Sequence, residues 1–215
     1  MKSFIGEKLL EIVLLSLWVS GTATVLAALW GLPLAIVIGL RDFKGRWVLR
    51  NIFNAFLGFP TVALGLILLM LFAHQGLFGF LGLVYTPEGI IIGEAILVTP
   101  IVVSFIVSAL ESVDPEIKDL ARTLGASERQ TSLAVLGEAK KGTILAIIAS
   151  FNRAIAELGV AQIIGANILG WTRVMTTTIA LDASRWNISE ALELTAILLA
   201  IVFALTFMIN ILRRD

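Results

Sequence analysis

Charged residues and cysteine are both scarce in this chain of 215 residues. Lys, Arg, Asp and Glu make up 15% of it, whereas a soluble globular domain carries about 25% charged residues. Cysteine is absent, which excludes a disulfide framework and a thiolate metal site. The formal net charge is zero, so the total charge does not favour a nucleic-acid-binding surface. The class of protein therefore has to be inferred from where the apolar residues lie.

Apolar residues make up 58% of the chain and gather in blocks. Five blocks stand out, at residues 9–40, 51–73, 89–110, 143–164 and 194–212. Each is long enough to cross a bilayer once, which takes about 20 residues. The first is about twice as long as the apolar run of a signal peptide, so we expect it to be retained. The sequence predicts an all-α, polytopic membrane protein with about five transmembrane helices.

The basic residues are unevenly distributed between the segments that join these blocks. Eleven of the sixteen Lys and Arg lie in the segments 41–50 and 111–141 and in the C-terminal tail. Basic residues concentrate in cytoplasmic loops. This pattern predicts an N-terminus outside, a cytoplasmic C-terminus and five crossings.

The segment 115–139 is polar and carries signals for two short helices. Asp114 can cap a helix that begins at Pro115, and Gly125 can end it in the left-handed conformation. Ser127 followed by Gln130 forms a capping box for a second helix. The sequence therefore predicts a cytoplasmic pair of helices joined by a glycine turn.

No phosphate-binding G-x-x-x-x-G-K-[ST] loop is present, so the chain is not expected to bind ATP in that way. If it moves a solute uphill, a partner has to supply the energy through a cytoplasmic surface. The small residues Ala121, Gly125 and Ala126 would let a short helix approach such a partner closely. A membrane-tethered DNA-binding regulator is the alternative for this helix pair, but its acidic and basic residues cancel, whereas DNA binding relies on positive charge.

The string DLARTLGAS, with Val135 downstream, resembles the EAA signature of ABC importer permeases, E-A-A-x3-G-x9-I-x-L-P. Asp119, Ala121 and Gly125 stand at its Glu, second Ala and Gly positions, while a Gly-Glu pair replaces its Leu-Pro. The resemblance implies that these helices couple the permease to an ATPase. The implied coupling residues are Asp119, Ala121, Arg122, Gly125, Ala126 and Ser127.

Three further strings resemble the molybdate, tungstate and sulfate branch of these permeases: FPTVALG, FNRAIAELG and GANILGWTRVMTTTIAL. The last is most similar to tungstate permeases, and molybdate and sulfate remain alternatives. The resemblance implies a type I ABC importer permease fold, with residues 1–215 forming one transmembrane domain in a prokaryotic cell (inner) membrane. It also implies a homodimer, an ABC ATPase dimer and an external oxyanion-binding protein. The subunit itself would be non-catalytic and bind no cofactor, with ATP and Mg on the ATPase.

Several polar residues and prolines within or beside the apolar blocks are candidates for the translocation path. Arg153 and Glu157 lie four residues apart, on one face of a helix, and form either a structural ion pair or part of the path. Pro60 and Pro100 each lie inside an apolar block and are expected to kink the helix there. The candidate set is Pro60, Thr61, Arg153, Glu157, Asn167, Thr176, Thr177 and Thr178. An alternative role for the three threonines and Asn167 is to cap a short external helix.

An ion-gradient-driven carrier without an ATPase is the main alternative to an importer subunit. Such a carrier would need its own coupling charges within the membrane. Only Glu94, Arg153 and Glu157 are available for that role in the predicted spans other than the first.

Overall fold

The computed structural model describes residues 2–214, with side chains for residues 8–211. This part of the chain is helical and contains no strand. Three of its helices are long and apolar enough to cross a membrane: α1 (Lys2–Leu40), α4 (Pro87–Glu111) and α10 (Ile188–Arg214). Pro100 lies inside α4 without ending it.

Two further candidate spans are broken. α2 (Arg46–Phe56) meets α3 (Thr61–Phe72) at 104°, and α7 (Lys140–Ile155) meets α8 (Gly159–Gly165) at 55°. Pro60 lies at the first break, where it cannot donate a backbone hydrogen bond and disfavours helix in the residue before it. The described chain thus has three candidate spans, or up to five if each bent pair crosses once.

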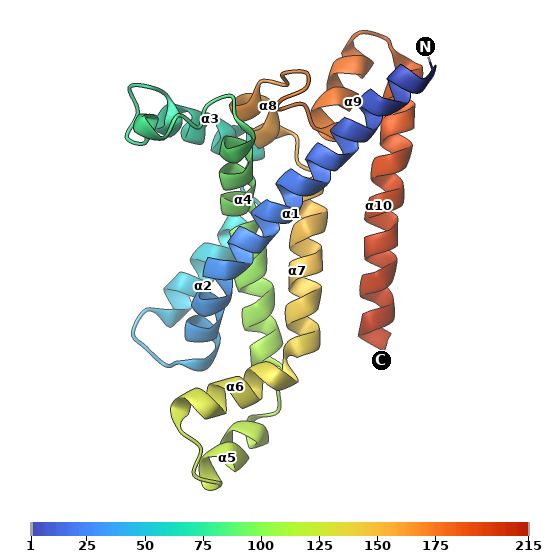
Figure 1. Cartoon of the computed structure of the whole chain (residues 1–215). Helices are drawn as coiled ribbons and strands as arrows, with labels where there is room; N and C mark the ends of the chain where they lie inside the picture. Colours follow the sequence, from blue (N-terminus) through green and yellow to red (C-terminus); the bar gives the residue numbers. More distant parts are fainter. Residues whose placement is uncertain (1, 215) are drawn as a thin grey trace.

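Shorter elements lie at the two ends of the long helices. They are η1 (Gly79–Leu81), α5 (Pro115–Thr123), α6 (Glu128–Glu138) and α9 (Met175–Ser184). In Figure 1, α1 runs diagonally across α4 and α7, and α10 lies beside α7, on the side away from α4. α5 and α6 project from one end, whereas α3, α8 and α9 lie at the other.

α1 and α4 form the central contact of the molecule. A methyl group added to Gly31 would lie 2.9 Å from Val102 Cγ1, so only glycine lets the two helices approach this closely. Trp30 Nε1 donates a 2.6 Å hydrogen bond to Thr99 Oγ1 beside this contact. Close packing through small residues is typical of helix association in membranes, where the hydrophobic effect does not drive helices together.

Arg46 ties together three helix ends at the α5–α6 end of the molecule. Its Nε donates to Ile38 O at 2.7 Å and its Nη2 to Gly39 O at 3.1 Å, which satisfies carbonyls at the end of α1. Glu111, the last residue of α4, pairs with Arg46 at 3.1 Å and with Arg50 at 2.8 Å. These bonds hold the ends of α1 and α4 at the same level.

α10 is the least covered of the long helices. Leu194 is buried near its start, but Phe203 and Phe207 are 65% and 67% exposed. A helix of this composition is stable in lipid, because all its backbone hydrogen bonds are internal and its apolar side chains can face the acyl chains.

Candidate functional site

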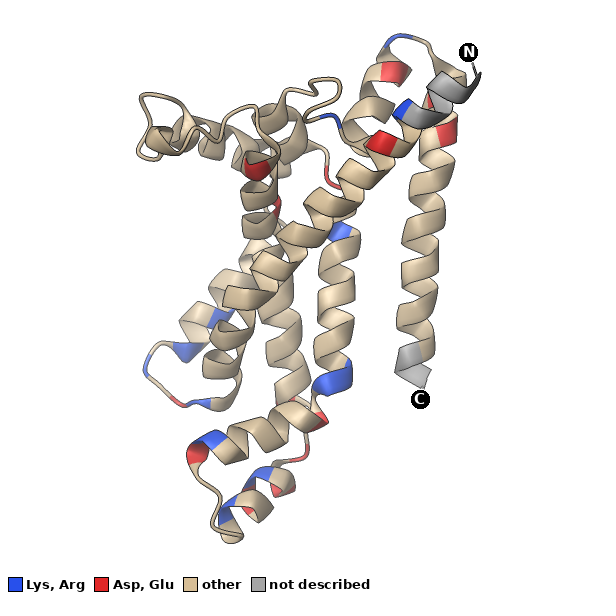
Figure 2. Cartoon of the chain, viewed as in Figure 1, with Lys and Arg blue, Asp and Glu red and all other residues tan. Residues whose placement is uncertain are grey.

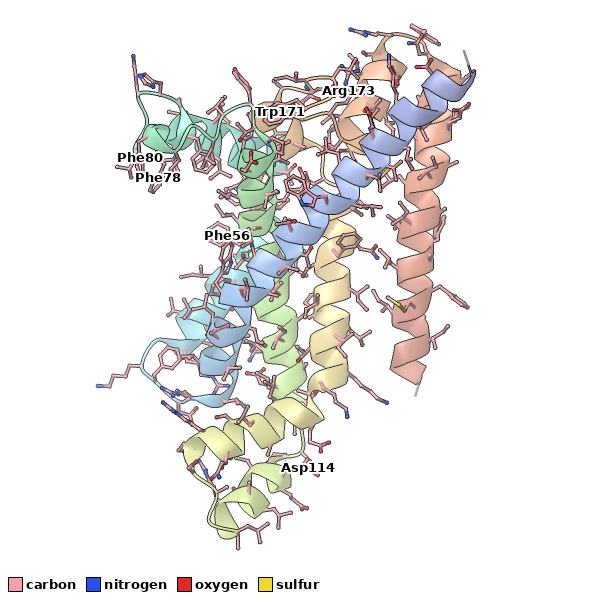
Figure 3. The ribbon with its side chains drawn as sticks, in the orientation of Figure 1. Phe56, Phe78, Phe80, Asp114, Trp171 and Arg173 are labelled. Atoms are coloured by element: carbon pink, nitrogen blue, oxygen red, sulfur yellow. The ribbon has the colours of Figure 1, made fainter. Side chains whose placement is uncertain are left out.

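The α5–α6 hairpin is built by its caps. The Asp114 carboxylate (labelled in Figure 3) accepts from Glu116 N at 3.0 Å, and Gly125 has φ +82° at the turn. Ser127 N donates to Gln130 Oε1 at 2.8 Å, and Gln130 N donates to Ser127 Oγ at 3.4 Å. This is the capping box that the sequence predicts, and it fixes where the second helix begins.

The hairpin presents uncovered apolar side chains. Leu120, Leu124 and Leu133 are 61%, 78% and 65% exposed. Asp119 and Arg122 are exposed as well, and Arg122 pairs with Glu128 across the turn at 2.9 Å. Apolar groups rimmed by charge are typical of protein interaction sites. Figure 2 shows charged residues gathered over α5, α6 and the start of α2.

One side of α6 is anchored in the body of the protein. Val135 is 4% exposed and belongs to the main apolar core, together with residues of α1 and α4. Thr131, one turn earlier, is 2% exposed. α5 packs mainly on α6. The hairpin is therefore joined to the long helices through α6.

Arg153 and Glu157 form an ion pair at the break between α7 and α8. Arg153 Nη1 lies 2.6 Å from Glu157 Oε2, and the Glu157 side chain is 2% exposed while that of Arg153 is 37% exposed. Glu157 Oε1 also accepts from Val160 N at 3.2 Å, which satisfies a backbone N–H in the first turn of α8. Thr176 Oγ1 donates to Glu157 O at 2.6 Å. Glu157 thus has a structural task besides the ion pair.

The start of α3 lies against the same break. A methyl group on Gly159 would lie 2.6 Å from Thr61 Oγ1, so the two helix starts are in direct contact. Pro60, which precedes Thr61, is exposed. Thr61, Glu157 and Thr176 come from three distant parts of the sequence, and the structure brings them together around one helix break.

Asn167, Thr177 and Thr178 form a separate group. Thr177 and Thr178 are 0% and 5% exposed, and both hydroxyls donate to Val174 O, at 3.0 and 2.8 Å. Asn167 Nδ2 donates to Thr177 O at 3.3 Å and its Oδ1 accepts from Arg173 Nε at 3.1 Å. Thr177 Oγ1 also accepts from Val174 N at 3.2 Å. These polar groups are therefore used at the start of α9 and in the loop before it.

Glu94 is a buried carboxylate in the core between α1 and α4. It is 2% exposed, and its Oε2 accepts from Ser20 Oγ of α1 at 3.0 Å. A charged side chain inside a membrane span is costly and is expected to have a partner. Ser20 supplies part of that requirement.

A polar face that sequence reasoning missed lies on α4 and α7. Ser108 lines a groove of about 390 Å³ between α4, α7 and α10. Ser104 lies one turn away on α4, and its buried Oγ has no hydrogen-bond partner. Asn152 on α7 donates to Thr206 Oγ1 of α10 at 3.2 Å, while its Oδ1 is also unsatisfied. Hydroxyl and amide groups in an apolar span are the signal that could have found this face.

No group of three or more His, Cys, Asp or Glu residues that could hold a metal ion occurs in the described part of the chain.

The fold and the projecting hairpin define a class of membrane transport protein. Residues 31–214 match the family described as binding-protein-dependent transport system inner membrane component, and the chain belongs to it. It is a multi-pass membrane protein.

Individual relatives are similar over most of their length. The chain is 38% identical to a probable anion ABC transporter permease protein of Haloferax volcanii, over 90% of this chain and 86% of the relative. It is 34% identical to the tungstate uptake system permease protein TupB of Peptoclostridium acidaminophilum, over 95% and 90%. A sulfate transport system permease protein, CysT of Salmonella typhimurium, is 30% identical over 89% and 72%. The resemblance to oxyanion permeases is confirmed.

Solved structures support the fold. An inward-facing MetNI methionine ABC transporter chain aligns with a TM-score of 0.81 at 16% identity, covering 100% of this chain and 99% of that chain. An amino acid ABC transporter chain aligns with a TM-score of 0.71 at 18% identity, covering 97% and 94%. At these identities the likeness concerns the fold alone.

Proposed function

We propose that this chain is the membrane-spanning subunit of an ATP-driven oxyanion importer, with tungstate as the substrate. The tungstate and anion permeases among the relatives support the substrate class. The subunit performs no chemistry and binds no cofactor. ATP and Mg bind to a partner ABC ATPase dimer, and an oxyanion-binding protein delivers the anion from outside a prokaryotic inner membrane.

The observation that carries this proposal is the α5–α6 hairpin. Leu120 and Leu124 are exposed on this hairpin beyond the long helices, while Val135 packs in the main apolar core. An ATPase that grips the exposed leucines and the polar residues around Gly125 can therefore move the helices of the membrane domain. In this proposal Asp119, Ala121, Arg122, Gly125, Ala126 and Ser127 form the coupling surface.

The distribution of charges supports the topology in this proposal. The ends that carry Arg46, Arg122 and Arg129 are cytoplasmic under the positive-inside rule, and both bent helix pairs cross the membrane, which gives five spans. One such subunit does not enclose a path, so two copies related by a twofold axis surround it. The path runs past the α7–α8 break, where Arg153, Glu157, Thr61 and Thr176 meet, and along the polar face of Ser104, Ser108 and Asn152.

Asn167, Thr177 and Thr178 take a positioning role in this scheme, because their polar atoms are used by neighbouring backbone and side-chain groups. Neutral donors such as the Ser108 hydroxyl suit a dianion that has to be released, since neutral hydrogen bonds are weaker than charge-assisted ones.

The test is uptake in vesicles that contain the chain with its ATPase and binding protein. We expect tungstate uptake that needs ATP and the ATPase. Uptake that continues without the ATPase and follows an ion gradient would instead support a carrier. Competition by molybdate and sulfate then ranks the substrates. Single cysteines at Arg122 and Arg129, in a chain without native cysteine, should react with an impermeant thiol reagent only from the cytoplasmic side.

A further inference from the structure

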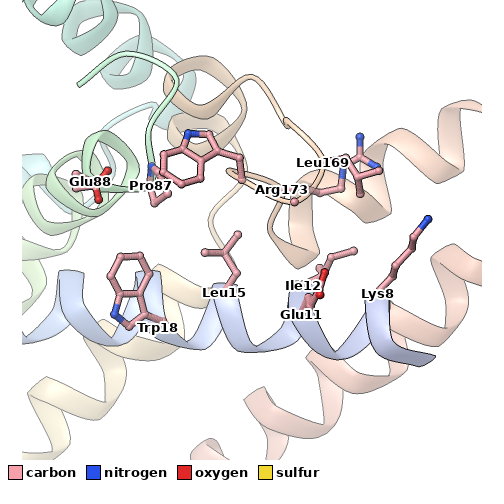
Figure 4. A pocket seen from close by; sticks show the side chains of 11 residues that line it. Lys8, Glu11, Ile12, Leu15, Trp18, Pro87, Glu88, Leu169 and Arg173 are labelled. Carbon is pink, nitrogen blue, oxygen red and sulfur yellow. The ribbon is translucent and has the colours of Figure 1, made fainter. Parts of the chain in front are cut away.

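A pocket of about 400 Å³ lies between the first half of α1, the start of α4 and the loop that joins α8 to α9 (Figure 4). Trp18 of α1 and Trp171 of the loop both line this pocket and are 50% and 51% exposed, and Leu15 follows Trp18 along α1 in Figure 4. Glu11, Glu88 and Arg173 add charge to the lining. None of these residues belongs to the path or the coupling surface described above.

Two parts of the lining are held in place by the protein itself. Trp171 Nε1 donates a 3.0 Å hydrogen bond to Tyr85 O. Arg173 Nε donates to Asn167 Oδ1 at 3.1 Å, and Arg173 Nη2 donates to Asn167 O at 3.2 Å. An indole wall and a guanidinium group are therefore oriented without a ligand, which lowers the entropic cost of binding one.

The helix lengths place this pocket at a membrane surface. Trp18 precedes the end of α1 at Leu40 by a rise of roughly 33 Å at 1.5 Å per residue. α4 has 25 residues, which corresponds to about 37 Å. Arg46 holds the ends of both helices together. Because the hydrocarbon core is about 30 Å thick, Glu88 at the start of α4 lies near the opposite headgroup layer. Trp18 of the oblique helix α1 lines the same pocket and therefore lies at that level, where tryptophan is enriched.

The charges of the lining are mixed rather than of one sign. Glu11 and Glu88 contribute two carboxylates, and Lys8 and Arg173 contribute two cations. A dianion such as an oxyanion is disfavoured beside two carboxylates. A ligand that carries both a cation and an anion matches this lining, and the indole rings favour an ammonium group over their faces.

We propose that this pocket binds the headgroup of a zwitterionic phospholipid from the leaflet at this end of the molecule. Arg173 binds the phosphate through charge-assisted hydrogen bonds. Glu11, Glu88 and the indole of Trp18 bind the ammonium group, and Leu15 contacts the start of an acyl chain. This proposal does not depend on the transported substrate, because it rests on membrane depth and pocket chemistry alone.

The test uses the full chain, purified in detergent and titrated with dioleoyl-phosphatidylethanolamine or dioleoyl-phosphatidylglycerol, with bound lipid counted by native mass spectrometry. We expect the zwitterionic phosphatidylethanolamine to bind more tightly than the anionic phosphatidylglycerol. Arg173→Gln should weaken the binding of phosphatidylethanolamine by about tenfold or more, because it removes a charge-assisted contact. Trp18→Ala should also weaken it.

Glu11→Gln/Glu88→Gln provides a variant that does not disturb the hydrogen bonds of Arg173. Removing both carboxylates should reverse the preference, so that the anionic lipid binds at least as tightly as the zwitterionic one. Trp47→Ala and Glu116→Gln, at the other end of the molecule, are the matched controls and should leave both affinities unchanged.

Equal binding of the two lipids by the unmodified chain would overturn the proposal. An unchanged preference in Glu11→Gln/Glu88→Gln would do so too. A disulfide formed between two copies of Trp18→Cys in membranes would show that a second copy covers the pocket, which also rules out a bound lipid.

Discussion

For the ion pair at the α7–α8 break, we predict both the size and the sign of the changes in unfolding free energy that substitutions cause. Arg153→Met removes the cation but leaves the Glu157 carboxylate, which is 2% exposed, with one backbone donor at 3.2 Å. Breaking a fully buried pair costs about 3–5 kcal/mol. Since the Arg153 side chain is 37% exposed and the pair is therefore not fully buried, we expect a cost of about 2–3 kcal/mol.

Glu157→Gln should cost less, about 1–2 kcal/mol, because the amide oxygen can still accept from Val160 N and the half-exposed Arg153 can be hydrated. The double variant Arg153→Met/Glu157→Gln no longer contains an unpaired buried charge. Adding Glu157→Gln to Arg153→Met should therefore restore stability, which is the opposite of what two additive losses would give.

The measurement is the thermal unfolding midpoint of each variant in one detergent. A change of 1 kcal/mol corresponds to about 2–4 °C for a chain of this size, so the rescue should raise the midpoint of Arg153→Met by a few degrees. A double variant that melts below Arg153→Met would refute the reasoning. Exchanging the two charges should not restore stability, because an arginine at 157 cannot accept the hydrogen bond from Val160 N.

Three other outcomes are expected. Gly125→Val should cost about 1–2 kcal/mol of local strain, because valine disfavours the φ of +82° found at Gly125, although nothing lies within 4 Å of an added Cβ. ATP-driven uptake should therefore fall in Gly125→Val and be retained in Gly137→Val, a helical position that is equally uncrowded. Equal uptake by the two variants would contradict this. Leu124→Asp should weaken ATPase binding in a pull-down by about tenfold, whereas Phe80→Asp at the other end should not; undiminished binding would count against the coupling surface. Gly93→Leu should lower the melting midpoint through overpacking worth about 1–3 kcal/mol, because an added Cβ would lie 2.5 Å from Val160 Cγ1. Gly58→Leu is the control and should leave the midpoint unchanged, because nothing lies within 4 Å of a Cβ added at Gly58.

The α5–α6 hairpin could be predicted in detail from the sequence, because its caps depend on local chemistry. Asp114, Gly125 and the Ser127–Gln130 box act within a few residues of chain, so their spacing is sufficient to place the helix ends. The three long apolar helices were predictable for a related reason, since length and composition alone decide whether a helix can cross a bilayer.

The two broken helix pairs were harder to foresee. A hydropathy block such as 51–73 contains no information on a 104° bend except its proline, and Pro100 shows that a proline inside an apolar block does not always end the helix. The α7–α8 break contains no proline at all. It is defined by tertiary contacts, namely Glu157 with Val160 N and Thr176, and Gly159 with Thr61, which sequence spacing does not reveal.

The same contacts explain why the candidate path residues separated into two groups. Polar residues in apolar surroundings signal that a partner is needed but not which one. For Thr177 and Thr178 the partner is the backbone of their own helix. For Ser104 Oγ and Asn152 Oδ1 the described residues supply none.

The hairpin and the helix breaks together suggest how motion is divided within one subunit. α6 is joined to the α1–α4 core through Val135, and Arg46 fixes the neighbouring ends of α1 and α4. A displacement of the hairpin is therefore expected to move α1 and α4 as a unit. The α7–α8 break interrupts a candidate span, and besides the ion pair and hydrogen bonds it is packed closely against the start of α3. We expect the two ends of the molecule to move relative to each other at this break. Weakening that break should consequently change the coupling between ATP hydrolysis and uptake before it unfolds the core.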